Sequence, residues 1–455
     1  MRKTLTGAVM LALTWPVGAL KARTMVRPPL PVNVCAAPGS AIVTIDARKQ
    51  AALATLMRDM VDKQIAPGVV MLIEQCGKPV VEIETGFADS ETKVAMRRDT
   101  LFRIYSMTKP LTSVAAMQLV EAGKLSLVDP VSKYIPEFAA ARVTAADGKT
   151  EALARPVNVR DLLMHNAGLT YSSAATDPVH SAYRRLGVPA GPGVASAPTD
   201  GSSPVQTTAE LAQRVARAPL MNQPGMRFTY GNASDVLGRV VEVASGMRLR
   251  DLIAARITVP LGMTDSAFIV SQAQVARLSA AYASPPQHPS KSEDTLQAVD
   301  IATLSKGQVF KIDSGATSIF LRPSKIDFGG AGMVSTAPDY LRFTQMLRQR
   351  GMLGTVRVLR PATIDAMRVD QLSEEARTKS PLLGGLGFGY GFAVRLTPTA
   401  TPPVFPRCGY FWGGAASTFF WVDPAGQSSG VMMTQVFGGD VRPYWLAAMK
   451  ILYGP

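Results

Sequence analysis

The sequence predicts an α/β protein of the α+β type, with an antiparallel sheet built from both chain ends and a mostly helical domain inserted between them. Two β-rich runs surround a Gly-Lys-Pro turn in residues 68–89, and further strand-like runs lie in 388–397 and 417–436. The middle of the chain is mostly helical in pattern. Strands at both ends, joined by hairpins, fit one sheet that the two ends complete together.

Composition supports a globular chain. Of the 455 residues, 47% are hydrophobic and 18% are charged, which excludes disordered and fibrous classes. The net charge of +14 raises the question of nucleic acid or anionic lipid as a partner. The basic residues are scattered through helix-like segments, however, with no run of five and no interleaved aromatic side chains. We therefore expect no nucleic-acid partner.

The elements follow in order. Residues 46–64 carry apolar side chains at helical spacing ahead of the first hairpin, and residues 107–270 contain several helical segments closed by Gly or Pro. Residues 188–204 and 282–294 are rich in Pro, Gly and Ser, which predicts two loops at a pocket rim. A helix over 337–351, the later strands and a last helix over 442–454 complete the chain.

This order predicts a domain division. Residues 45–105 and 325–455 are expected to form the sheet domain, and residues 106–324 the mainly helical domain. We expect the active site between the two.

The first 22 residues are typical of an export signal. Arg2 and Lys3 precede an apolar stretch, and Ala-Leu-Lys-Ala resembles a small-residue cleavage site. Export to the periplasm or secretion is therefore expected, and a cytoplasmic location if the segment is not a signal. No other stretch reaches about 18 uninterrupted apolar residues, so we expect no stable membrane insertion after its removal. Cys35, Cys76 and Cys408 are too few for a disulfide scaffold, although one pair would be able to bridge.

Ser106 and Lys109 stand three residues apart ahead of an apolar helical run that Gly123 closes. A serine at a helix start has a favourable dipole for developing negative charge, and the amine lies within reach as a base. Spacing alone favours a simpler interpretation, in which Ser106 caps the helix and Lys109 is solvated. A second Ser-x-x-Lys, at Ser90 and Lys93, lies in a polar stretch with no apolar helix after it.

A rival nucleophile lies in the sequence "GQSSG" around Ser428, which matches the Gly-x-Ser-x-Gly elbow of α/β-hydrolases. That elbow needs a helix after the serine and a histidine later in the chain. Here a strand follows, and the last histidine is His288. The three histidines form no metal-binding pattern, and no nucleotide-binding motif is present, so neither metal nor cofactor is expected.

Larger blocks resemble a known family. The segment "YSMTKPLTSVAAMQLVEAGKLSLVDPVSKYIPEF" resembles the serine-lysine segment of the β-lactamase and penicillin-binding-protein superfamily. The likeness is to its class C-like branch, which includes the family VIII carboxylesterases. "RDLLMHNAGLTY", "PGMRFTYGNASDVLGRVVEVASG" and "GGAGMVSTAPDYLRFTQML" resemble three further family blocks, in the expected order over residues 45–450. The resemblance implies a β-lactamase/transpeptidase-like fold.

The resemblance also implies roles for individual residues. Ser106 is the implied acylated nucleophile, Lys109 its activating partner and Tyr230 the second proton-transfer group, with Asn232 in the same Tyr-x-Asn element as a substrate-binding residue. An ordinary lysine is protonated at pH 7, so either burial of the lysine or its effect on the phenol has to supply a base. We treat Lys109 and Tyr230 as a coupled pair.

One family element is altered. The third motif is normally Lys-Thr-Gly, and here the corresponding place has Trp412-Gly413-Gly414, as in family VIII esterases. An indole cannot pair with the carboxylate of an antibiotic. By resemblance, the N–H groups of Ala415 and Ser106 form the oxyanion hole, and residues 412–414 contact the substrate.

The sequence therefore predicts a serine hydrolase, a carboxylesterase that cleaves short-chain esters through an acyl-enzyme on Ser106 without a cofactor, with a small-molecule ester as its partner. A β-lactamase or D-alanyl peptide hydrolase remains an alternative, and so does a slowly acylated sensor protein. The loops at 188–204 and 282–294 are expected to select the ester. The oligomeric state is not predicted.

Overall fold

The antiparallel sheet brings the two ends of the chain together. The computed structural model describes residues 44–194, 196–285, 304–396, 405–406, 408–438 and 440–454. Its eight-stranded sheet has the order β12-β13-β14-β15-β16-β1-β2-β3, and every pairing is antiparallel. The strands are β1 Gly68–Gln75, β2 Lys78–Asp89, β3 Val94–Ala95, β12 Gly387–Phe388, β13 Ala393–Val394, β14 Tyr410–Gly413, β15 Phe419–Asp423 and β16 Ser428–Met433. The predicted fold class is confirmed.

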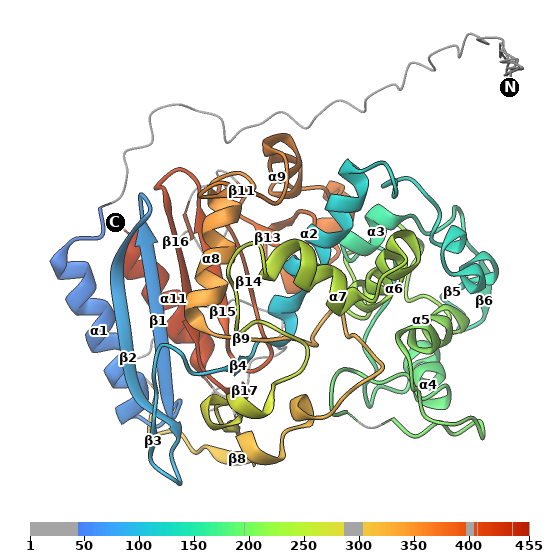
Figure 1. Cartoon of the computed structure of the whole chain (residues 1–455). Helices are drawn as coiled ribbons and strands as arrows, with labels where there is room; N and C mark the ends of the chain where they lie inside the picture. The colour runs from blue at the N-terminus through green and yellow to red at the C-terminus, as the bar shows by residue number, and fades with distance from the viewer. Residues whose placement is uncertain are drawn as a thin grey trace, which may run out of the picture. The chain divides into compact units, whose positions relative to one another are not determined.

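Helices cover both faces of this sheet (Figure 1). On one face lie α1 Ala47–Asp62 and α11 Val441–Tyr453, which contact each other, and on the other lies α8 Ala337–Arg348 against β1, β15 and β16. Buried Glu74 of β1 accepts hydrogen bonds from Arg348 of α8 and from Ser429 of β16. Burial of an ion pair is tolerated because these partners satisfy the carboxylate.

The segment between the two groups of strands is mainly helical, and α6 lies at its centre. Helix α6 contacts α2, α3, α5 and α7. The first turn of α6, which begins directly after Asn232, is buried, and the helix packs against α2. The helices are α2 Thr108–Glu121, α3 Val159–Leu163, α4 Pro178–Arg185, α5 Thr208–Arg217, α6 Ala233–Ser245, α7 Leu249–Ile253, α9 Pro361–Met367 and α10 Glu374–Thr378.

Four smaller sheets lie outside the main one. One is three-stranded, with the order β17-β7-β8, and three are pairs. Their strands are β4 Phe102–Arg103, β5 Arg142–Thr144, β6 Thr150–Ala152, β7 Ala281–Ser284, β8 Phe310–Asp313, β9 Val334–Ser335, β10 Met352–Leu353, β11 Val356–Arg357 and β17 Val436–Gly438. Short turns of helix join these elements, among them η1 Tyr105–Met107, η2 Val131–Lys133, η3 Pro136–Ala140, the π-turn η4 Ala254–Thr258, η5 Gln272–Arg277, η7 Gly315–Thr317, η8 Ile319–Leu321 and η9 Pro381–Leu383.

One predicted loop begins later than expected. The loop assigned to 282–294 was wrong at its start, because Tyr282 to Ser284 pair with Val436 to Gly438 as part of β7. A short, largely buried run can form a strand although prolines follow it. Residues 286–294 of that loop, and the predicted signal at 1–22, lie outside the described residues.

The pairing of β4 with β9 determines the position of the segment that carries Ser106. Strand β4 leads directly into η1 and α2, and it pairs with β9, which follows the turn at Phe328–Met333. Segments more than 230 residues apart in sequence therefore meet beside Ser106. The described residues belong to one compact unit, so the division into two domains stays a prediction. None of the described helices is long and apolar enough to cross a bilayer.

Candidate active site

Ser106 occupies the short 3₁₀ turn η1, immediately ahead of α2. The preceding residue, Tyr105, has a φ of +40°, in the left-handed region that a residue with a bulky side chain rarely adopts. Such a conformation persists only where the surrounding packing enforces it. Pro110 falls in the first turn of α2, where a missing amide hydrogen costs least. The local sequence thus fixes the serine at the start of a buried helix.

Lys109 is buried, with only 1% of its surface exposed. Its Nζ lies 3.1 Å from Ser106 Oγ, 2.8 Å from the Tyr171 hydroxyl and 2.8 Å from the carbonyl oxygen of Gly330. Three acceptors match the three N–H donors of an ammonium group. The simpler interpretation from spacing, a solvated lysine, is therefore wrong, because the side chain turns inward against Ser106.

Tyr171 is the residue that the sequence analysis missed. It ends the block "RDLLMHNAGLTY", which carried the resemblance, but nothing in its spacing links it to Lys109. Burial raises the pKa of Tyr171 well above its ordinary value, and the neighbouring Tyr230 and Asp235 raise it further. Tyr171 is therefore a neutral phenol at physiological pH, able to accept a hydrogen bond from Lys109 and to donate one in turn.

Tyr230 closes the crevice from the other side. The Lys109 Nζ lies 4.7 Å from the centre of the Tyr230 ring, and the Tyr171 and Tyr230 rings meet edge to face at 5.6 Å. Gly231 permits this approach, because a Cβ at that position would lie 2.2 Å from the backbone of Thr170. A cation within about 6 Å of a ring is attracted by it. Ser106, Lys109 and Tyr230 thus meet in one crevice.

Asn232 is fully buried below this crevice. Its Nδ2 donates to Asp235 Oδ2 at 3.4 Å, and its Oδ1 has no hydrogen-bond partner among the described residues. Asp235 also accepts from the N–H of Gly330, whose carbonyl accepts from Lys109. Burial raises the pKa of Asp235, and the positive charge of Lys109 opposes that rise. Asn232 therefore supports the wall around Lys109, and its predicted contact with substrate stays a prediction.

Strand β14 supplies the opposite wall. Trp412 is half-buried, packs against the Tyr230 ring and donates from Nε1 to the Tyr230 hydroxyl at 3.3 Å. Gly413 ends the strand and Gly414 follows it, and a Cβ on Gly414 would lie 2.4 Å from the carbonyl oxygen of Ile104. Only glycine allows the chain to approach the Ser106 segment so closely.

Ala415 follows at the exposed turn after β14. Its N–H group has no acceptor in the described part of the chain. A free amide hydrogen beside the Ser106 segment suits an oxyanion hole, in which a donor awaits negative charge that develops later. The pairing of this group with the N–H of Ser106 stays a prediction.

His165 lies behind the phenols. It is buried among the rings of Phe228, Tyr230 and Phe388, with its centroid 4.8 Å from that of Tyr230. Burial lowers the pKa of His165 well below its ordinary value, and Lys109 lowers it further. The imidazole therefore stays neutral. Neither His165 nor any other described residue takes part in a cluster of three or more potential metal ligands.

Comparisons with known proteins fit this geometry. A family model described as Beta-lactamase matches residues 53–452. The chain belongs to the β-lactamase family. It is 33% identical over 389 residues to esterase EstB of Burkholderia gladioli, a match that covers 85% of this chain and 90% of EstB. It is also 27% identical over 363 residues to the lovastatin esterase of Penicillium rubens, covering 75% of this chain and 81% of that enzyme.

A solved structure gives the same assignment. EstCE1, described as a hydrolase with promiscuous acyltransferase activity, matches with a TM-score of 0.70 and 30% identity, covering 90% of this chain and all of EstCE1. The predicted membership in the serine β-lactamase and penicillin-binding-protein superfamily is confirmed.

Proposed function

We propose that this β-lactamase-family chain is a serine esterase that cleaves short-chain carboxylic esters through an acyl-enzyme on Ser106. The relatives EstB and lovastatin esterase and the neighbour EstCE1 support an ester-hydrolysing enzyme of this fold. The observation that carries the assignment to Ser106 is its contact with buried Lys109, which also contacts Tyr171 and lies over Tyr230.

The chemistry proceeds in two halves. Ser106 Oγ attacks the ester carbonyl carbon and gives up its proton, and the carbonyl oxygen becomes an oxyanion next to the N–H groups of Ser106 and Ala415. The bond to the alcohol oxygen then breaks, and the alcohol leaves with a proton. Water attacks the acyl-enzyme in the second half, so the acid is released and the Ser106 hydroxyl is restored.

The proton moves through Lys109 and Tyr230 as one unit. Lys109 lies within hydrogen-bond distance of the nucleophile, and its Nζ lies over the ring of Tyr230. Tyr171 is unsuited to the role of base because burial raises its pKa. It holds Lys109 in place instead.

An ester fits this crevice better than a β-lactam. Trp412 occupies the place of the family's cleft lysine, so a substrate carboxylate finds an indole there instead of an ammonium group. The indole also donates to Tyr230, which links the substrate wall to the proton-transfer pair.

The test uses p-nitrophenyl butyrate as the substrate and Ser106→Ala as the variant. The variant should lose at least about 10³-fold in kcat/KM, and intact-mass measurement of the wild type should show an acyl adduct that Ser106→Ala lacks. Undiminished activity in the variant would remove Ser106 as the nucleophile. A marked preference for a cephalosporin over the ester would favour the β-lactamase alternative, and an adduct that persists for hours would favour the sensor.

A second candidate function is acyl transfer to an alcohol. The solved neighbour EstCE1 has promiscuous acyltransferase activity as well as hydrolase activity. Transfer differs from hydrolysis only in the second half, where an alcohol replaces water. Formation of butyl butyrate when the enzyme acts on p-nitrophenyl butyrate in the presence of 1-butanol would establish it.

A further inference from the structure

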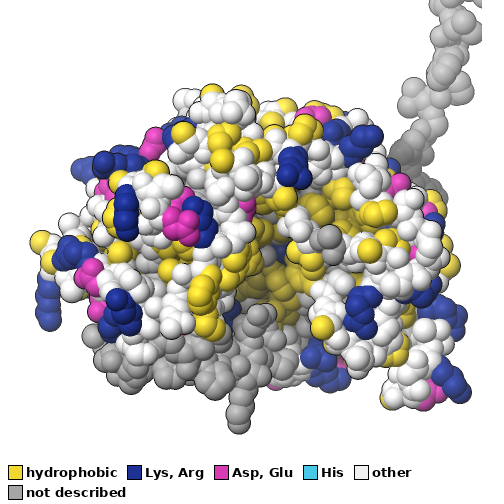
Figure 2. Space-filling model, turned by 90° about the horizontal axis from the view of Figure 1, so that it is seen from below, with side chains coloured by type: hydrophobic (Ala, Val, Ile, Leu, Met, Phe, Trp, Pro, Cys, Tyr) yellow, Lys and Arg dark blue, Asp and Glu magenta, His cyan; other side chains and the backbone are white. Residues whose placement is uncertain are grey.

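A second cavity lies beside the crevice. Its volume is about 610 Å³, and it lies between the chain at Gly187–Gln206 and the chain at Ile319–Gly332. None of the reacting side chains Ser106, Lys109, Tyr171 and Tyr230 is among the described residues that line it. The lower face of the molecule is hollowed, and apolar side chains gather in that hollow (Figure 2). A cavity of this size suits a small organic ligand.

The cavity shares a wall with the catalytic crevice. Gly332 lines the cavity and lies two residues after Gly330, whose carbonyl accepts from Lys109. Phe320 also lines it, and its ring meets Tyr105 edge to face at 6.0 Å, immediately next to Ser106. The turn at residues 328–332 and this aromatic pair therefore separate the two spaces. An ester arm that leaves Ser106 past Tyr105 and Phe320 would enter the cavity.

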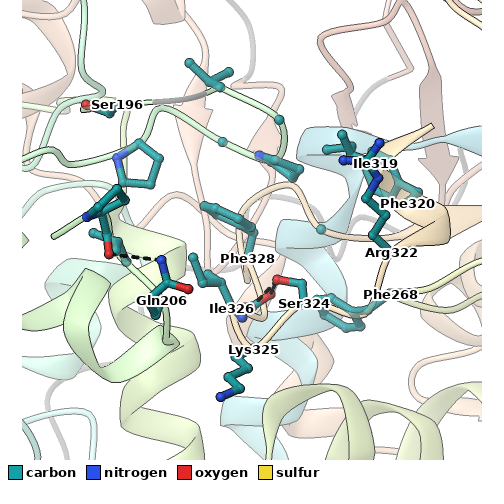
Figure 3. A pocket seen from close by; sticks show the side chains of 18 of the residues that line it. Ser196, Gln206, Phe268, Ile319, Phe320, Arg322, Ser324, Lys325, Ile326 and Phe328 are labelled. Atoms are coloured by element: carbon teal, nitrogen blue, oxygen red, sulfur yellow. Dashed lines mark hydrogen bonds between the residues drawn. The ribbon is translucent and has the colours of Figure 1, made fainter. Parts of the chain in front are cut away.

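The lining is apolar but carries charge at one end. Phe268, Ile319, Phe320 and Phe328 form apolar walls (Figure 3). The guanidinium of Arg322 lies beside Ile319 and Phe320, whereas the side chain of Lys325 points away from them (Figure 3). No ion pair or side-chain hydrogen bond to Arg322 is found in the described part of the chain. Arg322 is therefore an unpaired cation next to apolar surface.

The surrounding charges are also positive. Arg248 and Arg250 both donate to the carbonyl of Ser324 and pair with Asp327. Arg322 and Lys325 bring the cations around residues 322–327 to four. The carboxylates near them are Asp327 and Glu242, and Glu242 pairs with Arg239. Asp327 is thus already neutralised, and an anion that enters the cavity meets a net positive field.

We propose that this cavity binds an apolar arm of the ester that ends in a carboxylate, with Arg322 as the partner of that carboxylate. The inference rests on the proposed esterase function and names its substrate class. Apolar walls take up a hydrocarbon arm, and the guanidinium group pairs with a carboxylate in a fixed geometry. A neutral arm makes the apolar contacts but forms no ion pair with Arg322.

Two matched pairs of esters test the proposal from both sides of the bond. On the acyl side, the mono-p-nitrophenyl ester of suberic acid is compared with p-nitrophenyl octanoate. On the alcohol side, 8-acetoxyoctanoate is compared with octyl acetate. In at least one pair the carboxylate ester should have the higher kcat/KM, by about fivefold, as expected for a partly exposed charge pair. The pair that responds identifies the half of the substrate that occupies the cavity.

Three variants complete the design. Arg322→Gln should abolish the preference for the carboxylate, and Lys325→Gln, whose side chain points away, should retain it. Ile319→Ser, at a partly exposed apolar position, should lower kcat/KM for both members of the responding pair. Hydrolysis of p-nitrophenyl acetate, which is too short to reach the cavity, should be unchanged in all three. No preference in either pair, or a preference that survives Arg322→Gln, would overturn the proposal.

A binding experiment separates the cavity from the chemistry. In the Ser106→Ala protein, calorimetry with octanoate and octanol measures occupancy without turnover. Octanoate should bind about fivefold more tightly than octanol, and Arg322→Gln should remove that difference. If the wild type fails to hydrolyse p-nitrophenyl acetate while this binding pattern holds, the esterase function fails and the carboxylate site stands. Equal binding of the two ligands would refute the site itself.

Discussion

The two walls around Ser106 are built in opposite ways. On the helix side, Lys109 is buried and makes three hydrogen bonds. One of them goes to the carbonyl of Gly330, whose N–H donates to buried Asp235. On the strand side, Trp412 is half-buried and Ala415 is exposed, with a free N–H group. The helix-side wall is buried and its polar groups are hydrogen-bonded, and we call it the closed wall. The strand-side wall is partly exposed, and we call it the open wall.

The difference separates two tasks. A group that moves protons has to be held in a fixed geometry, so Lys109 lies on the closed wall. Groups that meet the substrate need unsatisfied donors and accessible surface, so they lie on the open wall. Substitutions on the closed wall should therefore affect kcat most, and substitutions on the open wall should affect KM more.

The largest effect is expected from Lys109→Met, which keeps the length of the side chain and removes its charge. We expect kcat to fall about 10³-fold, because the amine that contacts the nucleophile and lies over the Tyr230 ring is lost. Steady-state kinetics with p-nitrophenyl butyrate measure the change. Lys124→Met, at an exposed lysine just beyond α2, is the matched control. A loss of tenfold or less would place the base elsewhere.

A smaller effect on the same wall is expected from Tyr171→Phe. Removing one hydrogen bond to a charged group should lower kcat about 10- to 100-fold with little change in KM. Tyr410→Phe removes a buried hydroxyl that has no partner in the described residues, and it should leave kinetics unchanged. Should both variants behave alike, Tyr171 is only a packing residue.

The open wall is tested by Trp412→Phe. Phenylalanine offers less surface to the substrate than the half-buried indole does, so kcat/KM should fall about three- to tenfold, mainly through KM. Trp445→Phe removes an indole N–H that has no acceptor among the described residues, and serves as the control. A kcat effect as large as that of Tyr171→Phe would erase the distinction between the two walls.

The smallest effect concerns stability and pH. The pKa of buried His165 is lowered, so below pH 6.5 the unfolded chain binds a proton there that the folded chain does not, and the free energy of unfolding falls as pH falls. This group should therefore lower the free energy of unfolding progressively as the pH falls below 6.5. His165→Asn suits the left-handed backbone at this position, where φ is +53°, and removes the titration. Urea unfolding at pH 7 and pH 5 should show a smaller pH dependence for the variant, and an equal dependence would mean that His165 charges in the folded state.

Sequence patterns predicted the fold well for physical reasons. Strand alternation and hairpin turns are local, so both ends of the sheet were found, and the strand after Gly426 excluded Ser428 as an elbow serine, since Ser428 begins β16. The strand at Tyr282–Ser284 was missed because its partner, β17, lies about 150 residues away and no local pattern indicates that pairing.

The site was predicted in part. Ser106, Lys109 and Tyr230 were found by resemblance and meet as expected, whereas spacing alone favoured a solvated lysine. Tyr171 lies 62 residues from Lys109, and Gly330 lies 221 residues away, so their contacts depend on the folded chain. Export through residues 1–22 remains a proposal, because those residues lie outside the described structure.

The wall at residues 328–332 bears on attempts to alter substrate range. Its two faces serve different spaces, since Gly330 faces Lys109 and Gly332 lines the neighbouring cavity. A smaller side chain at Phe328 would enlarge the cavity, whereas any side chain at Gly332 would press against the ring of Phe268. Either change would disturb the turn that holds the lysine, and so trade selectivity against turnover. The chain at Gly187–Gln206 contributes the facing wall without touching Lys109, which makes it the safer place to introduce diversity.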